Sequence, residues 1–161
     1  MTSLTEGEMS MAEALATFDD PARECAKVVL PHVIPGISYL EDHPDKYDID
    51  LIAFEQGGKK VGYVELESSR AWGKKLQFPR HWEGLSFLAE RKKKYITDEK
   101  WQDVPMWFVM FNENQTAFAI VNREIIRKSP IVTRSRTWKP FEEFFMVPHG
   151  QFDQYVVKDL L

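Results

Sequence analysis

The chain has 161 residues, a formal net charge of −4 and 43% hydrophobic residues. This composition suits one folded domain with an apolar core, and it excludes a disordered chain or a uniformly basic coat protein. The single cysteine, Cys25, excludes an internal disulfide and a multi-cysteine zinc site. No apolar run reaches the roughly 20 residues of a membrane-spanning helix, and the N-terminus does not resemble a signal peptide. We therefore expect a soluble cytoplasmic protein with no membrane partner.

The first predicted elements are helical. Residues 9–18 have helical composition, and a second helix is expected from about 21 to 30. It begins after Asp19 and Asp20, which are suited to capping, and ends at Pro31. A short strand at 37–40 follows.

Two strand patterns then flank Gly57 and Gly58, at 47–55 and 60–67. They predict a hairpin closed by a two-residue turn, because glycine adopts the positive φ that such turns need.

The later elements complete an α/β pattern. Residues 72–84 look irregular, 85–96 have helical spacing with the basic run 91–94 facing outward, and 106–121 contain a second hairpin pattern. This order predicts an α/β domain whose central mixed sheet contains an antiparallel meander and is flanked by helices. We interpret the chain as a single domain with a frayed or peripheral start (1–20), a core of about 20–121 and an aromatic, basic C-terminal extension (122–161).

Four carboxylates fall on one face of the first predicted hairpin. With Gly57 and Gly58 as the turn, Asp50 lies opposite Glu65 and Asp48 lies opposite Glu67. Side chains alternate along strands, so these four share a face, while the other face carries Ile49, Leu51, Ala53, Gly62, Val64 and Leu66. Opposed like charges are destabilising, and Mg²⁺ or Mn²⁺ would relieve the repulsion. The alternative is an acidic sheet end without metal, balanced by lysine or arginine.

Asp50 and the run Glu65-Leu66-Glu67 resemble the motif of the PD-(D/E)XK nuclease superfamily, which has the restriction-endonuclease-like fold. The resemblance covers about residues 20–121, and the stretch 65–94 is also similar to small uncharacterised members from phages and prokaryotes. It implies a Mg²⁺- or Mn²⁺-dependent endonuclease that hydrolyses DNA phosphodiester bonds. A homodimer is expected, in the cytoplasm of a prokaryotic or phage-infected cell.

The same resemblance suggests residue roles. Asp50 and Glu65 would be metal ligands, Glu67 a ligand or general base, and Asp48 an auxiliary acid. Glu67 stands where the motif usually has lysine, and in some members a lysine from the next helix takes over, so Arg91 or Lys92 is a candidate here. The expected catalytic residues are Asp50, Glu65, Glu67 and Lys92. The alternative is a catalytically inactive protein of this fold that binds DNA or a protein.

Positive charge is concentrated in the second part of the chain. Residues 1–50 hold 11 acidic and 3 basic residues, whereas residues 51–161 hold 14 acidic and 18 basic residues. A basic cluster can bind a polyanion, although a solvated surface is the simpler interpretation. The candidate nucleic-acid-binding residues are Arg91, Lys93, Arg127, Lys128, Arg134 and Arg136. An aromatic group that could instead bury a dimer interface comprises Trp138, Phe141, Phe144 and Phe145.

Overall fold

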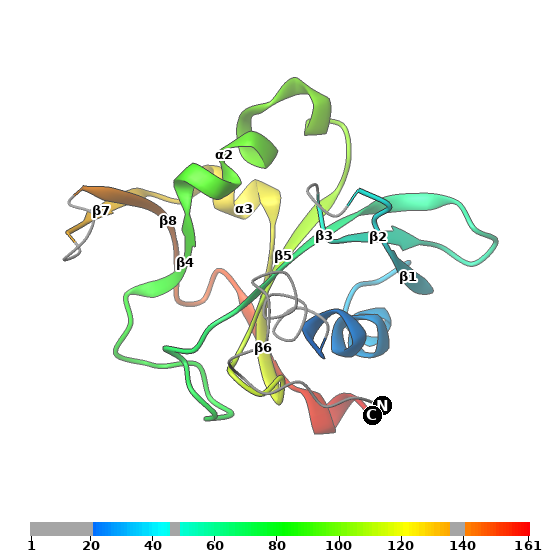
Figure 1. Cartoon of the computed structure of the whole chain (residues 1–161), viewed down its shortest axis with the longest axis horizontal. Helices are drawn as coiled ribbons and strands as arrows, with labels where there is room; N and C mark the ends of the chain where they lie inside the picture. The colour runs from blue at the N-terminus through cyan, green and yellow to red at the C-terminus, as the bar shows by residue number, and fades with distance from the viewer. Residues whose placement is uncertain (1–20, 46–48, 136–140) are drawn as a thin grey trace, which may run out of the picture.

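Two β-sheets of unequal size organise the chain in the computed structural model, which describes residues 21–45, 49–135 and 141–161 (Figure 1). The six-stranded central sheet contains, in spatial order, β1 (Tyr39–Asp42), β2 (Leu51–Phe54), β3 (Lys60–Ser68), β5 (Met106–Phe111), β6 (Ala117–Asn122) and β9 (Asp153–Val156). The smaller sheet contains β4 (Gly84–Leu88), β8 (Glu142–Pro148) and β7 (Ile131–Arg134).

Short helices connect and flank these sheets. Residues 21–29 are α-helical, as predicted. The others are α2 (Ala89–Thr97), α3 (Arg123–Lys128) and the 3₁₀ turns η2 (Leu30–His32), η3 (Glu99–Trp101) and η4 (Val157–Leu160). The predicted class, a mixed α/β fold with a mixed central sheet and flanking helices, is confirmed. Within the described ranges, no helix is long and apolar enough to cross a membrane.

The central sheet is mixed because β3 has one antiparallel and one parallel neighbour. Strands β1, β2 and β3 form an antiparallel meander, whereas β3 and β5 run parallel. A parallel pair requires a crossover connection, and here the crossover contains β4 and α2. The crossover therefore brings α2 over the face of the sheet on which Glu65 and Glu67 of β3 lie.

Each face of the central sheet has its own apolar core. On one face, Ala22, Ala26 and Val29 of helix 21–29 join a cluster that includes Leu51 and Val64. On the other face, residues of α2, α3 and the smaller sheet cover β5 and β6. Figure 1 shows helix 21–29 beside β1–β3, and α2 and α3 close to the smaller sheet. β3 therefore lies between an apolar helix on one side and α2 on the other.

The first hairpin reaches the predicted register by a route that the sequence prediction missed. The turn has three residues instead of two, because the N–H of Glu55 donates to the carbonyl of Lys59 at 2.9 Å. The pairing then shifts between Ala53 and Phe54, where a bulge adds one residue to β3. The extra turn residue and the bulge cancel, and Leu51 pairs with Val64 as predicted.

The predicted helix at 85–96 is wrong in its first part. Residues 84–88 form β4, which pairs with β8, and Leu85 and Phe87 alternate into the core. The helix begins only at Ala89. Lys92 also departs from the prediction that the basic run faces outward, since it is 6% exposed.

The C-terminal segment 122–161 belongs to both sheets. It supplies β7 and β8 to the smaller sheet and β9 to the edge of the central sheet. Phe144 and Phe145 are buried within this chain, so their predicted place in a dimer interface is wrong. Phe141 is 79% exposed, and Trp138 lies outside the described residues.

Candidate active site

β3 directs two glutamates to the face covered by α2. Glu65 and Glu67 alternate with Val64 and Leu66, which pack on the opposite face against the core formed by helix 21–29. Glu65 is only 7% exposed, while Glu67 is half-buried. The alternation of β3 thus separates an apolar face from an acidic one.

Lys92 on α2 completes this acidic face. It shares the buried side of the helix with Tyr95 and Ile96, at spacings of three and four residues. Its Nζ lies 2.6 Å from Oε2 of Glu65 and 3.2 Å from Oε1 of Glu67. Of the two candidates, Arg91 and Lys92, the structure brings Lys92 to the glutamates and leaves Arg91 exposed.

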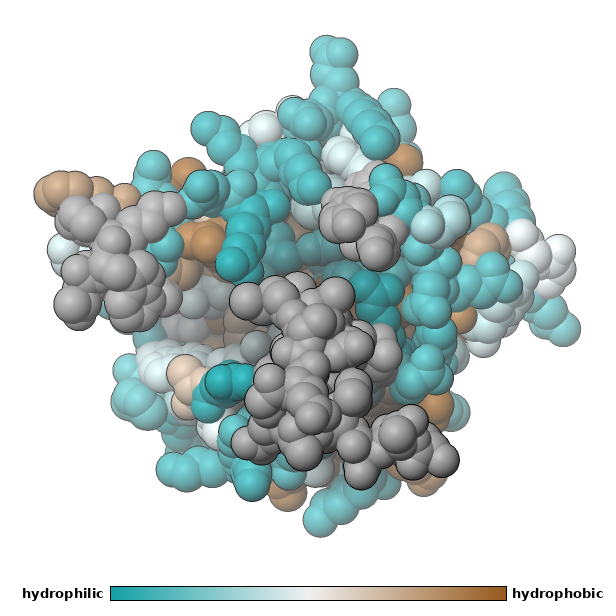
Figure 2. Space-filling view, viewed as in Figure 1, coloured by the Kyte–Doolittle hydropathy of each residue, from teal (hydrophilic) through white to brown (hydrophobic). Residues whose placement is uncertain are grey.

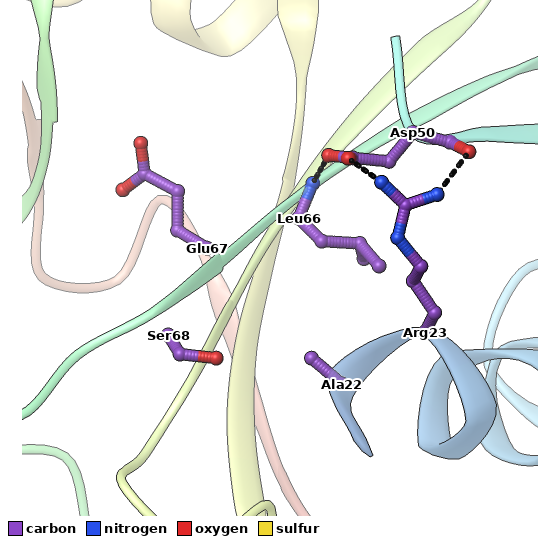
Figure 3. Close-up of a pocket in the computed structure, with 6 residues that line it drawn as sticks. All are labelled: Ala22, Arg23, Asp50, Leu66, Glu67 and Ser68. Carbon is purple, nitrogen blue, oxygen red and sulfur yellow. Dashed lines mark hydrogen bonds and ion pairs between the residues drawn. The ribbon is translucent and has the colours of Figure 1, made fainter. Parts of the chain in front are cut away.

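Asp50 sits immediately before β2 and is held by two donors (Figure 3). Its Oδ2 accepts the N–H of Leu66 at 2.8 Å, beyond the last backbone pair of the ladder, Leu51 with Val64. Its Oδ1 lies 3.0 Å from Nη2 of Arg23, on helix 21–29. A second nitrogen of Arg23 donates to the Asp50 carbonyl at 3.4 Å. The carboxylate is therefore fixed in orientation at the start of β2.

The chain before β2 does not continue the strand alternation. Ile49 was expected on the same face as Leu51, but it packs into the opposite core. The physical reason is that β2 begins only at Leu51 and the backbone bends at Asp50. Asp50 reaches its position through this bend, and Asp48 lies outside the described residues.

Burial and neighbouring charges control protonation at this site. Burial raises the pKa of Glu65 to about 7, against the opposing effect of the Lys92 ammonium. The negative charge and hydrogen bonding of Asp50 raise the pKa of Glu65 further. Burial alone would lower the pKa of Lys92, but the carboxylates of Glu67 and Glu65 outweigh it and the net pKa is raised. Lys92 is thus a buried ammonium at neutral pH.

An open cleft of about 440 Å³ gives access to Asp50, Glu65 and Lys92. It is lined by Asp50, Glu65, Leu66, Glu90, Arg91, Lys92, Lys94 and Tyr95. A second pocket of only about 20 Å³, space for about one water, lies between Arg23 and Glu67 (Figure 3). Asp50 borders both spaces.

The donor set fits a metal held by two carboxylates better than one held by four. Within the described ranges, no group of three or more His, Cys, Asp or Glu side chains is arranged to hold an ion. Two of the carboxylates, Glu65 and Glu67, already have a cation partner in Lys92. Asp50 and Glu65 both line the cleft, and one or two carboxylates are what Mg²⁺ usually takes from a protein.

The predicted nucleic-acid-binding residues do not behave alike. Arg91 and Lys93 are exposed on α2, and Arg91 lines the cleft. Arg127 is bound to Glu124 at 2.6 Å, and Arg134 is ion-paired with Glu83. Lys128 is exposed, and Arg136 lies outside the described residues. Of the candidates placed by the structure, Arg91 is the one that lines the cleft with Asp50 and Glu65.

Arg23 is the residue at this site that sequence reasoning missed. It is one of only three basic residues among the first 50, where eleven are acidic. A lone arginine on the buried side of a helix in so acidic a segment was the available signal. Its partner could not be identified without knowing that helix 21–29 packs beside Asp50.

Comparison with known proteins gives no match for this chain. No protein-family model matches it, no curated protein matches it, and no solved structure matches it. Function is therefore inferred from the geometry of Asp50, Glu65, Glu67 and Lys92.

Proposed function

We propose that this protein is a metal-dependent endonuclease of restriction-endonuclease-like fold that hydrolyses DNA phosphodiester bonds. The observation that carries the proposal is the position of Lys92, whose Nζ lies 2.6 Å from Glu65 on the cleft that Asp50 also lines. The motif at Glu65-Leu66-Glu67 lacks its usual lysine, and α2 supplies an ammonium at the same carboxylates.

The order of the elements around the site supports the same proposal. Helix 21–29 is followed by the meander β1-β2-β3, then by α2, and then by β5 parallel to β3. This agrees with the helix, meander, helix and further strand that the resemblance implies. β4, which belongs to the smaller sheet, is inserted before α2.

Each residue has a distinct task in the proposed reaction. Mg²⁺ or Mn²⁺ held by Asp50 and Glu65 would supply a Lewis acid and lower the pKa of water. Lys92 brings a fixed positive charge to the cleft, where it would stabilise the charge that develops on the phosphate oxygens. Glu67 is half-buried and lies within hydrogen-bonding distance of Lys92. It would accept the proton from the attacking water or hold Lys92 in place.

DNA is the proposed partner, and a pair of chains would be needed to cut both strands together. The test is cleavage of supercoiled plasmid by the purified protein with Mg²⁺ or Mn²⁺, compared with EDTA. We expect Glu65→Gln to reduce cleavage on the order of 10²-fold or more, as for the loss of other groups that stabilise a transition state. The matched control Glu143→Gln changes an exposed glutamate on β8 and is expected to cleave normally.

Two results would contradict the nuclease proposal. One is the absence of metal-dependent nicking by the folded wild-type protein at any concentration tested. The other is equal cleavage by the wild-type protein and Glu65→Gln. DNA binding that is the same with and without EDTA, with no nicking, would favour the catalytically inactive alternative.

A further inference from the structure

The connection between β3 and β4 is a second basic segment next to the site. Residues 69–83 contain four lysine or arginine residues and one acidic residue, Glu83, in a chain whose net charge is −4. The four basic residues, all exposed, are Arg70, Lys74, Lys75 and Arg80. Glu83 is ion-paired with Arg134 of β7. The segment therefore presents a positive surface to solvent.

Buried aromatic side chains of the segment itself anchor its backbone to the protein core. Trp72 and Phe78 are 2% and 1% exposed and stack edge to face at 5.1 Å between ring centroids. The indole N–H of Trp72 donates to the carbonyl of Gln77 at 3.0 Å, and its backbone N–H donates to Oγ of Ser69 at 3.1 Å. The backbone that carries the lysines is thus held at both ends.

The turn between β5 and β6, together with β9, holds the same segment by hydrogen bonds. The N–H of Glu113 donates to the carbonyl of Gly73 at 2.9 Å, and the side-chain amide of Asn112 donates to the carbonyl of Lys75 at 3.0 Å. The N–H of Phe78 donates to Gln154 of β9 at 3.1 Å. A connection of this length without regular secondary structure is uncommon, and is usually either disordered or functional. This one is ordered.

The segment starts close in sequence to Glu65 and Glu67, whose carboxylates are paired with Lys92 of α2. Residue 69 follows Glu67 by two positions, and Figure 1 shows the connection leaving β3 at the lower left while α2 lies above. Arg91 and Lys94 of α2 line the cleft. Figure 2 shows mostly hydrophilic side chains at the top of the same view, where α2 lies. Positive charge therefore lies on α2 beside the cleft and on the segment that follows Glu67 in the chain.

This arrangement suits a ligand that carries many regularly spaced negative charges. Carboxylates repel a phosphate chain, so a protein that brings the two together needs cations beside the carboxylates. Within the described part of the chain, Lys74 and Lys75 form no ion pair, unlike Arg127 and Arg134. Their ammonium groups remain available to an external anion, on a backbone whose order reduces the entropy lost on binding.

We propose that residues 69–83 bind the phosphate backbone of a DNA duplex, with Lys74 and Lys75 as contact residues. The choice of DNA rests on the proposed function, since the same duplex would be presented to the carboxylates. The segment therefore acts as a binding arm that follows Glu67 in the chain.

The test measures duplex binding in EDTA, so that no metal-dependent cleavage occurs. Fluorescence anisotropy of a short labelled duplex is recorded over a salt series for the wild type and for Lys74→Gln/Lys75→Gln. Each phosphate contact contributes about 0.9 to the slope of log affinity against log salt, so the double variant should lose a slope of about 2. The control Lys59→Gln/Lys158→Gln removes the same charge from the hairpin turn and from η4, and its slope should match the wild type.

Three results would overturn the inference: no duplex binding by the wild type, an unchanged slope in Lys74→Gln/Lys75→Gln, or an equal loss in the control. Binding to anionic lipid vesicles without binding to the duplex would also overturn it. Matching thermal unfolding of both double variants would verify that each is folded. Duplex binding that depends on Lys74 and Lys75, together with no plasmid cleavage, would reject the proposed nuclease activity and support this inference.

Discussion

Two ion pairs near β3 differ in burial. The more exposed pair mainly orients a carboxylate, whereas the buried pair strongly affects the stability of the fold. Arg23 and Asp50 have side chains 18% and 21% exposed, whereas Lys92 and Glu65 have side chains 7% and 9% exposed. Solvent screens the first pair, so it mainly orients Asp50. The second pair is shielded from water, so either partner left alone would be a costly buried charge.

The largest expected effect is on the buried pair. Lys92→Met removes the ammonium and leaves Glu65 and Glu67 without their cation, which should destabilise the fold by about 3 kcal/mol at pH 9. The loss should be smaller at pH 5, where Glu65, whose pKa is raised already, takes up a proton. Urea unfolding at both pH values measures this. An equal loss at pH 5 and pH 9 would contradict the assignment of a buried charged pair.

Glu65 should give the opposite pH dependence to an ordinary ion-paired carboxylate. Its folded pKa of about 7 lies above the reference value of 4.5, so between these values the folded state binds more protons than the unfolded state. The free energy of unfolding therefore falls as the pH rises through this window, by no more than about 3 kcal/mol. Glu65→Gln should remove this fall, while Glu143→Gln should keep it. A wild type whose curve from pH 4.5 to 7 is parallel to that of Glu65→Gln would disprove the raised pKa.

The Arg23–Asp50 pair, which is more exposed than Lys92–Glu65, should respond more weakly to mutation. Arg23→Ala should destabilise the fold by about 1 kcal/mol, because it removes hydrogen bonds to both the side chain and the carbonyl of Asp50. It should also weaken Mn²⁺ binding, measured by calorimetry, since Asp50 loses one of its two orienting donors. Arg23→Lys, which keeps the charge, should recover part of the affinity. Mn²⁺ binding unaffected in Arg23→Ala would show that Leu66 alone positions Asp50.

A third, more exposed ion pair should make the smallest contribution to the free energy of unfolding. Arg134 and Glu83 have side chains 43% and 62% exposed. Arg134→Gln should change the free energy of unfolding by less than about 0.5 kcal/mol, because exposed ion pairs contribute little. Thermal unfolding at low and high salt measures this. A loss as large as that of Arg23→Ala would mean that burial does not order the three pairs.

The sequence pattern predicted the sheet better than it predicted the site. The hairpin register was correct because apolar alternation at Leu51 and Val64 fixes which residues face the core, whatever the turn length. The three-residue turn and the bulge lie beyond the reach of a pattern with period two. β4 was mistaken for the start of a helix because Leu85 and Leu88 also fit helical spacing, and its pairing with β8 depends on residues far along the chain.

The members of the site depended on tertiary packing to different degrees. Glu65 and Glu67 follow from strand alternation, and so were predictable. The basic residue of the site could be narrowed only to Arg91 or Lys92, because the sequence does not show which side of α2 faces the sheet. No local pattern predicted the bend at Asp50. Its contact with Arg23 joins residues that are 27 positions apart in the chain, so local patterns could not predict it either.

The most direct measurement is a crystal of the protein soaked in Mn²⁺, with data collected for anomalous scattering. A peak coordinated by the carboxylates of Asp50 and Glu65, with Lys92 still adjacent, is the predicted result. Mn²⁺ bound elsewhere, or Asp50 and Glu65 unchanged and unliganded at saturating Mn²⁺, would contradict it.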